Sequence, residues 1–217
     1  MSRGRELIAR RIARLFKPGD VVNLGIGLPT MVANYIPPDA GILLHSENGF
    51  IGVGATPSIE EADKDLVNAG GQPVSIMRGG ACFDSAMSFC VIRGGHLAAT
   101  VLGALEVDEQ GNLANWMVPG KLIPGMGGAM DLVVGAKRVI IAMEHTTKEG
   151  APKILKRCNL PLTAAGEVDL IVTELGVMEV AKEGIILREL APGVSVADIQ
   201  ARTEAALIIP EVIDVMG

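Results

Sequence analysis

Short apolar runs that end in polar or glycine-rich loops recur along this 217-residue chain. DVVNL at 20–24 and GILLHS at 41–46 are the first two, and further runs are expected to form strands at 73–77, 97–102, 139–143 and 170–173. Apolar runs of about 4–8 residues bounded by turn signals are typical of strands buried on both faces. Segments with helical spacing separate these runs. This alternation predicts the α/β class, with an open, mostly parallel sheet flanked by helices.

Helices are expected where apolar residues recur at helical spacing, at 7–16, 31–35, 83–92 and 196–206. Pro18-Gly19 is expected to end the first helix, with Arg10, Arg11 and Arg14 on its solvent-exposed face. The segments 177–180 and 185–190, joined by Lys182-Glu183-Gly184, predict a small hairpin near the C-terminus. No internal repeat or linker divides the sequence, so residues 1–217 are expected to form a single domain.

The composition excludes several classes of protein. Hydrophobic residues make up 49% of the chain and the mean hydropathy is +0.39, whereas disordered chains contain too little apolar surface for such values. A net charge of −6 argues against nucleic acid as a partner, because that binding depends on clustered Lys and Arg. The N-terminal segment does not resemble a signal peptide, and no apolar stretch approaches the ~18 residues of a membrane span. We therefore expect neither a nucleic-acid partner nor a membrane.

Cysteine and histidine residues do not form a recognisable metal or nucleophile motif. Cys82, Cys90 and Cys158 are an odd count without paired spacing, which indicates a reducing compartment such as the cytoplasm. The first two are expected to be buried, inert thiols on a helix. The histidines are scattered, and His45, inside an apolar run, is expected to be a core histidine with its hydrogen bonds satisfied. No metal site is expected.

Motifs for nucleotide cofactors and for a serine nucleophile are missing as well. The sequence contains no GxxxxGK[ST] motif for ATP, and the first glycine loop lacks the third glycine of a dinucleotide fingerprint. GxSxG, which marks a serine nucleophile, does not occur either. The chemistry that remains uses a carboxylate.

Four carboxylates follow apolar runs, at the position where open α/β sheets bind ligands. They are Glu47, Glu106, Glu144 and Glu174. Most acids at strand ends are simply solvated. Glu47 ranks first because Asn48-Gly49 follows it, and such a turn exposes a side chain and lets a ligand approach the backbone. A pairing of Glu144 with His145 is a weaker alternative, because adjacent residues in a strand face opposite ways.

Glycine-rich loops supply the second feature of a candidate site. They lie at Gly25-Ile26-Gly27, Gly79-Gly80, Gly94-Gly95 and Gly125-Met126-Gly127-Gly128. Backbone N–H groups of consecutive glycines are able to bind an anion or a developing oxyanion. The last loop precedes the helix-like AMDLVV, and helix N-termini favour negative charge. A carboxylate facing glycine amides is therefore the arrangement that the sequence favours.

Several segments resemble the β subunit of family I CoA-transferases. They are VNLGIGLPTMV at 22–32, SENG at 46–49, FDSAMSF at 83–89, IRGGH at 92–96 and GNLANWMVPGKLIPGMGGAMDL at 111–132. The resemblance covers nearly the whole chain, and the last motif is long enough to be highly specific. KDLVNAGG at 64–71 is most similar to the acetate/butyrate–acetoacetate branch. The succinyl-CoA:3-oxoacid and 3-oxoadipate branches share most of these motifs and remain alternatives.

The resemblance implies a fold, a reaction and a nucleophile. The fold is that of the CoA-transferases, an open α/β sheet, and the nucleophile is the glutamate of the SENG motif, Glu47. It attacks an acyl-CoA thioester, and the CoA then moves onto Glu47 as a thioester. An incoming carboxylate reverses these steps, which is ping-pong covalent catalysis. Coenzyme A is then a substrate, and neither a cofactor nor a metal is expected.

The resemblance also implies roles for residues around Glu47. Gly128, with Gly127, is expected to donate backbone N–H groups to the oxyanions, and Asn23 to contact CoA. The remaining residues expected to bind substrate or CoA are Gly25, Gly27, Asn48 and Gly49.

A partner completes the expected enzyme. The family pairs the β subunit with a homologous α subunit, commonly as α2β2, and the substrates are an acyl-CoA and a short-chain carboxylate or 3-oxoacid. Two other functions stay open: an acyl-CoA hydrolase, in which water replaces the acceptor acid, and a ligand sensor without catalysis. A covalent adduct on Glu47 would distinguish an enzyme from a sensor.

Overall fold

The structure is a computed structural model that describes residues 3–120 and 125–217. Five helical segments are described: α1 (Arg3–Ala13), the 3-10 helix η1 (Leu28–Tyr35), α2 (Ser85–Arg93), α3 (Ala129–Gly135) and α4 (Val196–Gln200). The first strands are β1 (Val21–Leu24), β2 (Leu43–Ser46), β3 (Phe50–Val53), β4 (Ile76–Cys82), β5 (Ala99–Leu102), β6 (Glu106–Asp108) and β7 (Leu113–Ala114). The others are β8 (Val139–Ala142), β9 (Ile154–Leu155), β10 (Leu170–Val172), β11 (Gly176–Ala181), β12 (Gly184–Leu190), β13 (Leu207–Ile208) and β14 (Asp214–Val215).

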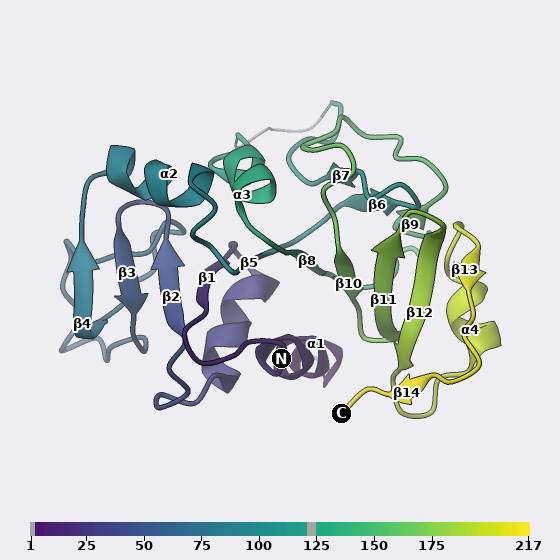
Figure 1. The fold of residues 1–217 in the computed structure, drawn as a ribbon, viewed down its shortest axis with the longest axis horizontal. Helices are drawn as coiled ribbons and strands as arrows, with labels where there is room; N and C mark the ends of the chain where they lie inside the picture. Colours follow the sequence, from purple (N-terminus) through teal and green to yellow (C-terminus); the bar gives the residue numbers. More distant parts are fainter. Residues whose placement is uncertain (1–2, 121–124) are drawn as a thin grey trace.

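One large sheet runs through the molecule (Figure 1). In the described part of the chain it has eleven strands in the order β13-β12-β11-β10-β8-β5-β1-β2-β3-β4, with β14 also paired to β12. Its centre, from β10 to β2, is parallel, and the strands added on both sides begin with antiparallel pairs. The α/β class and the mostly parallel sheet are therefore confirmed.

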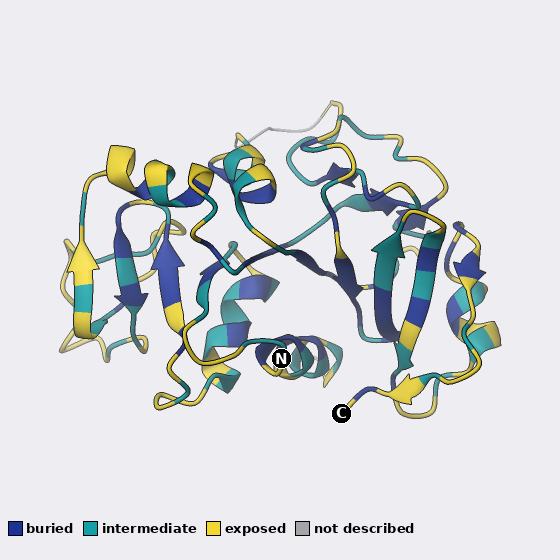
Figure 2. Cartoon of the chain, in the orientation of Figure 1, coloured by how far each residue is buried: buried dark blue, intermediate teal, exposed yellow. Residues whose placement is uncertain are grey.

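Helices cover both faces of the central strands, which Figure 2 shows as mainly buried. On β8, Ile140 packs into the cluster that contains Ile8 and Ile12 of α1, whereas Ile141 packs into the cluster that contains Ile92 of α2. Successive strand residues point to opposite faces, so a strand covered on both sides is apolar throughout. This explains why the central strands read as continuous apolar runs.

The predicted helices form, but their ends differ. α1 ends at Ala13, before Pro18-Gly19, and α4 covers 196–200 instead of 196–206. Asp84 caps α2 by accepting a hydrogen bond from the N–H of Met87 at 2.8 Å. The hairpin is confirmed as β11 and β12.

The antiparallel edge formed by β3 and β4 was not predicted. The expected strand at 73–77 is wrong in position, because β4 begins at Ile76 and continues through Gly79-Gly80, which was expected to be a loop. A Cβ atom on Gly52 of β3 would lie 2.9 Å from Gly80 Cα. These glycines therefore allow the two backbones to approach closely, and Gly79-Gly80 does not form an anion-binding loop.

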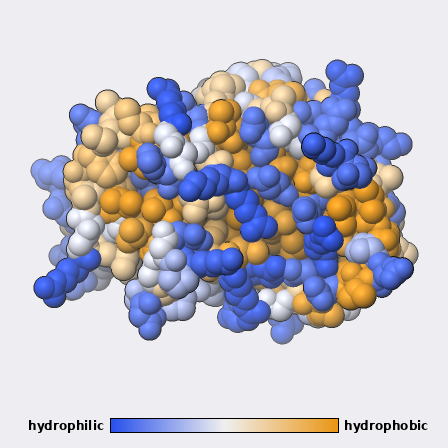
Figure 3. Space-filling model, in the orientation of Figure 1, coloured by the Kyte–Doolittle hydropathy of each residue, from blue (hydrophilic) through white to orange (hydrophobic). Residues whose placement is uncertain are grey.

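Two further regions lie outside the central sheet. β6, β7 and β9 form a three-stranded sheet that was not predicted. Exposed large hydrophobic residues occur along the C-terminal segment, at Ile208, Ile209, Val212 and Val215, and Figure 3 shows hydrophobic surface at the end of the molecule that carries β13 and β14. Within the two described ranges, no helix is long and apolar enough to span a membrane.

Candidate active site

Glu47 follows β2 directly, at the carboxyl end of the parallel strands. Its side chain is half-buried and binds a residue of the neighbouring strand: Asn23 Nδ2 of β1 donates to Glu47 Oε2 at 3.2 Å. Asn23 and His45 are register partners in the parallel pair β1–β2, which brings Asn23 beside the residue that follows β2. The two strands thus hold a carboxylate and an amide against each other.

Gly128 lies on the other side of this carboxylate. A Cβ atom on Gly128 would be 3.6 Å from Glu47 Oε1 and 3.2 Å from Phe89 Cζ. Gly128 is buried and forms the N-cap of α3. Oε2 is bound to Asn23, and Oε1 is the carboxylate oxygen that lies near the glycine. The structure therefore brings together Asn23, Glu47 and Gly128, three residues that lie far apart in the sequence.

The turn after Glu47 is tied to a loop from elsewhere in the chain. Asn48 Nδ2 donates to the carbonyl oxygen of Val67 at 2.7 Å, and Asn48 Oδ1 accepts from Ser46 Oγ at 2.7 Å. Gly49 has a φ of +133°, and its carbonyl oxygen accepts from Phe83 N at 2.8 Å. Asn48 and Gly49 therefore shape the turn that presents Glu47, and their contact with a substrate stays a prediction.

The remaining predicted binding glycines lie in two loops. Gly25 N donates to Val101 O at 2.8 Å, which ties the loop after β1 to β5. Gly27 and Gly127 both have positive φ, and a Cβ atom on either would meet no atom within 4 Å. Both are exposed. Residues 121–124 of the long 111–132 motif lie outside the described residues.

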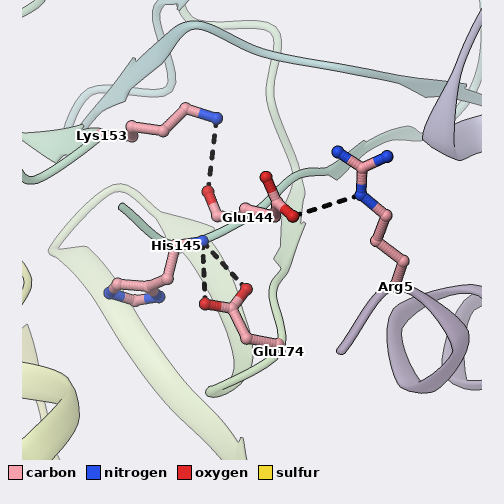
Figure 4. A network of polar contacts seen from close by, with 5 residues as sticks. All are labelled: Arg5, Glu144, His145, Lys153 and Glu174. Carbon is pink, nitrogen blue, oxygen red and sulfur yellow. Dashed lines mark hydrogen bonds and ion pairs between the residues drawn. The ribbon is translucent and has the colours of Figure 1, made fainter. Parts of the chain in front are cut away.

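The other three strand-end carboxylates have structural partners. Glu106 Oε2 accepts from the backbone N–H groups of Asn159 and Leu160, at 2.7 and 3.0 Å. Glu144 forms an ion pair with Arg5 of α1, and Glu174 accepts from the N–H of His145 at 3.0 and 3.3 Å (Figure 4). Glu47 alone of the four has a glycine beside its free oxygen, and this distinguishes it chemically.

Glu144 and His145 do not act as a pair. Glu144 is exposed, whereas the His145 ring is buried between Thr173 and Thr203, with each ring nitrogen 2.9 Å from a threonine Oγ1. Burial lowers the pKa of His145 to about 4, so the ring is neutral at pH 7. Lys153 Nζ donates to the carbonyl oxygen of Glu144 (Figure 4), and burial lowers its pKa too. These residues hold α1, β8 and β10 together.

His45 and Ser88 lie beneath Glu47, and the sequence did not identify them as part of the site. His45 is buried, with Nδ1 3.3 Å from Asn23 Nδ2 and Nε2 3.0 Å from Ser88 Oγ of α2. Burial lowers the pKa of His45 to about 4. The expectation of a core histidine with satisfied hydrogen bonds is correct, but only the sheet register shows that its partner binds Glu47. The sequence signal for His45 was the polar residue that follows apolar Leu44 near the end of a strand, directly before the candidate site.

Two of the three cysteines differ from the prediction. Cys82 lies in β4 rather than on a helix, and both Cys82 and Cys90 are exposed, so the prediction of buried thiols is wrong for these two. Burial, with Asp108 nearby, raises the pKa of Cys158 to about 12, which keeps this thiol protonated. Among the described residues, no group of three or more His, Cys, Asp or Glu is placed to hold a metal ion.

Comparison with known proteins places the chain in one family. The coenzyme A transferase family matches residues 5–202. The chain is 59% identical over 207 residues to the β subunit of acetate CoA-transferase from Haemophilus influenzae, covering 95% of this chain and 92% of that protein. It is 47% identical over 205 residues to one subunit of a probable succinyl-CoA:3-ketoacid coenzyme A transferase from Bacillus subtilis, covering 94% and 95% of the two chains.

A solved structure has the same fold over the whole chain. It is an acyl-CoA transferase apoenzyme from Escherichia coli O157:H7, with a TM-score of 0.80 and 25% identity. The match covers 99% of this chain but 43% of the solved one, so this chain spans less than half of that longer protein. The chain therefore belongs to the coenzyme A transferase family.

Proposed function

We propose that this chain is the β subunit of a CoA-transferase of the acetoacetate type, and that Glu47 carries CoA as a thioester during transfer. The observation that carries the proposal is the Glu47 carboxylate itself. One oxygen is held by Asn23, and the other faces Gly128. The other strand-end acids are occupied by backbone N–H groups or by Arg5. Relatives named as acetate and succinyl-CoA:3-ketoacid CoA-transferase subunits support a short-chain carboxylate or 3-oxoacid as substrate.

The proposed reaction exchanges bonds at the Glu47 carboxylate. Its free oxygen attacks the thioester carbonyl carbon, the C–S bond breaks, and CoA leaves as the thiolate. The thiolate then attacks Cδ of Glu47 in the resulting anhydride, the original acid leaves as a carboxylate, and a glutamyl-CoA thioester remains. An acceptor carboxylate runs the same steps in reverse and leaves as its CoA thioester. Across the whole reaction, one thioester and one carboxylate are replaced by another thioester and carboxylate, and the proposal includes no cofactor and no metal.

Glycine amides are suited to the charge that develops in this reaction. Each addition turns the oxygen of the attacked carbonyl group into a negatively charged oxyanion. Gly128 lies beside the attacking oxygen of Glu47. Its backbone N–H, with that of Gly127, is the proposed oxyanion donor. Loss of one such donor typically costs about 3 kcal/mol of transition-state stabilisation.

The names of the relatives support a second type of subunit. Both relatives are named as single subunits of a CoA-transferase, so we propose a homologous α subunit as partner, in an α2β2 assembly. The three cysteines are free, as is usual in a reducing compartment, and the cytoplasm is the proposed location.

Intact-mass spectrometry tests the proposal directly. The chain, co-expressed with its α subunit, is incubated with acetoacetyl-CoA, and the mass of the β chain is measured before and after acetate is added. We expect a CoA-sized adduct that maps to Glu47 and is discharged by acetate. Glu47→Ala should form no adduct, whereas the matched strand-end variant Glu144→Ala should still form it.

Other outcomes would point elsewhere. An adduct lost in water as fast as in acetate would indicate an acyl-CoA hydrolase. A wild-type complex that binds acetoacetyl-CoA without any adduct would rule out the covalent mechanism and leave a binding protein.

A further inference from the structure

A row of buried polar side chains lies under the candidate nucleophile. Thr100 of β5, Asn23 of β1 and His45 of β2 occupy neighbouring register positions, and all three are at most 3% exposed. The residues before them, Val22 and Leu44 among them, pack into the core on the α1 face. The row therefore points to the opposite face, where Ser88 of α2 contacts His45.

The amide of Asn23 is held at its NH2 end. Nδ2 is 3.2 Å from Glu47 Oε2, 3.3 Å from His45 Nδ1 and 3.4 Å from the carbonyl oxygen of His45. A carboxylate and a carbonyl oxygen only accept hydrogen bonds, so this end of the amide must be the nitrogen. The buried Oδ1 has no hydrogen-bond partner among the described residues. The orientation of Asn23 thus depends on His45 and Glu47.

The same contacts determine the tautomer of His45. The Asn23 NH2 group only donates, so His45 Nδ1 must carry the lone pair. In a neutral ring the hydrogen then lies on Nε2, which donates to Ser88 Oγ at 3.0 Å. Burial, which lowers the pKa of His45 to about 4, keeps the ring neutral in the physiological range. Phe83 stacks on this ring with centroids 6.4 Å apart.

We propose that His45 is a positioning residue: with its Nε2–H donated to Ser88 and its Nδ1 accepting from Asn23, it holds the Asn23 amide so that Glu47 keeps one oxygen free toward the substrate. This inference rests on the proposed function of Glu47. His45 touches neither substrate nor the reacting atoms. It acts through Asn23, and its effect is on orientation, to which attack by a weak nucleophile is sensitive: a misplacement of about 1 Å can cost up to about 100-fold in rate.

Removal of Ser88 is the mildest way to disturb this arrangement. In Ser88→Ala the buried Nε2–H loses its acceptor, so the Nε2–H tautomer is less favoured and only the Asn23 NH2 group opposes hydrogen on Nδ1. That hydrogen would face the Asn23 NH2 group and turn the amide away from Glu47. His45→Leu removes the acceptor altogether, whereas His45→Asn keeps an acceptor oxygen near the position of Nδ1.

The test measures the rate of the first half-reaction in the complex with the α subunit. The appearance of the CoA adduct on the β chain is followed by rapid quenching and mass spectrometry at increasing acetoacetyl-CoA. We expect the maximal rate to fall about 10- to 100-fold in His45→Leu and about threefold to tenfold in Ser88→Ala. The acetoacetyl-CoA concentration for half-maximal rate should change less than about threefold, and His45→Asn should recover most of the rate.

His145→Leu is the matched control, because it removes another buried neutral histidine that lies outside the site. It should lower the melting temperature and leave the rate of adduct formation unchanged. Wild-type rates in both His45→Leu and Ser88→Ala would overturn the inference, as would an equal loss of rate in His145→Leu. A changed half-maximal concentration with an unchanged maximal rate would also overturn it, because His45 would then serve binding.

Failure of the proposed function gives a different result. If the wild-type complex forms no adduct, both the function and this inference fall. If the wild type forms the adduct and the variants match it, the inference alone falls.

Discussion

Gly128 and Gly49 both lie close to Glu47, but an added methyl group would meet different surroundings at the two positions. At Gly128 the φ of −83° suits any residue, and the nearest atoms are the end of the Phe89 ring and Glu47 Oε1. At Gly49 the φ is +133°, and a Cβ atom would lie 2.1 Å from the carbonyl oxygen of Phe83. Gly128 leaves space beside the carboxylate, whereas at Gly49 the backbone conformation and the nearby Phe83 carbonyl require a glycine.

Gly128→Ala should therefore impair the reaction while the protein still folds. The methyl group would occupy the space beside the free oxygen of Glu47, where the thioester carbon must approach. We expect adduct formation to slow by about 10- to 100-fold, with the melting temperature of the complex within about 3 °C of wild type. Rapid quenching and calorimetry measure the two quantities. A wild-type rate would show that this space is not used.

Gly49→Ala should instead destabilise the protein. A side chain at this φ is strained, and the backbone of Phe83 would have to move. We expect a loss of about 3 kcal/mol, which for a chain of this size lowers the melting temperature by roughly 6–12 °C. Calorimetry of the complex at fixed concentration checks this. An unchanged melting temperature would mean that the turn relaxes easily.

At the scale of elements, α1 is fastened to the sheet by an ion pair that the sequence did not predict. Arg10, Arg11 and Arg14 were expected on a solvent-exposed face, but the Arg11 side chain is 17% exposed and binds both carboxylate oxygens of Glu189 in β12. The neighbouring Arg188 pairs with Glu179 at the surface, where both side chains are 45% exposed. Helical spacing identifies the apolar face of α1, but not which β strand lies beside its polar face.

These two pairs should differ in their contribution to stability. Arg11→Ala leaves a half-buried carboxylate without its partner and should cost about 2 kcal/mol, or roughly 4–8 °C in melting temperature. Arg188→Ala, its surface counterpart, should cost at most about 1 kcal/mol because solvent screens the pair. Thermal unfolding of both variants in the assembled enzyme tests this. Equal falls in the melting temperatures of the two variants would contradict the prediction that the more buried ion pair contributes more.

The central sheet was predictable from sequence because burial on both faces makes its strands continuously apolar. Runs such as VIIA at 139–142 need no knowledge of their neighbours. β3 and β4 at the edge lack this signal: β4 contains Arg78 and two glycines, and only two of its residues were predicted as strand. The three-stranded sheet of β6, β7 and β9 was missed because its strands have two or three residues each.

The candidate site was predictable in part for a similar reason. Glu47 stands at the end of an apolar strand before Asn48-Gly49, and this local pattern is visible in the sequence. The link from Ser88 through His45 and Asn23 to Glu47 joins α2, β2 and β1, and depends on register. Register between β1 and β2 is fixed by tertiary packing, so single-sequence patterns do not contain it.

At the scale of the whole molecule, two buried neutral histidines lie at separate places in the fold. His45 lies under α2 beside the candidate site, and His145 lies between β10 and the segment after α4. Burial lowers the pKa of both to about 4, from about 6.5 in an unfolded chain. Neither ring has an acidic partner in these contacts that would stabilise a charge: their hydrogen bonds are to Asn23, Ser88 and two threonines.

The direction of the pH dependence follows from these shifts. Between about pH 6.5 and 4 the unfolded chain binds protons that the folded chain excludes, so acid favours unfolding. The free energy of unfolding is unaffected by protonation of the two histidines above about pH 7, where both rings are neutral in either state. It decreases as the pH drops through 6.5 toward 4. Lowering the pKa from 6.5 to about 4 corresponds to on the order of 3 kcal/mol for each histidine at the lower end of this range.

We therefore expect the melting temperature of the assembled enzyme to fall steadily between pH 7 and 4.5, before most carboxylates bind protons. His145→Asn should start from a lower melting temperature and show a shallower decline, because one of the two excluded protons is gone. Calorimetry at fixed ionic strength and protein concentration gives both curves. The comparison separates the histidine effect from acid effects common to both proteins. Parallel curves would mean that His145 accepts a proton without loss of the fold, and its contacts with Thr173 and Thr203 would then tolerate the charged ring.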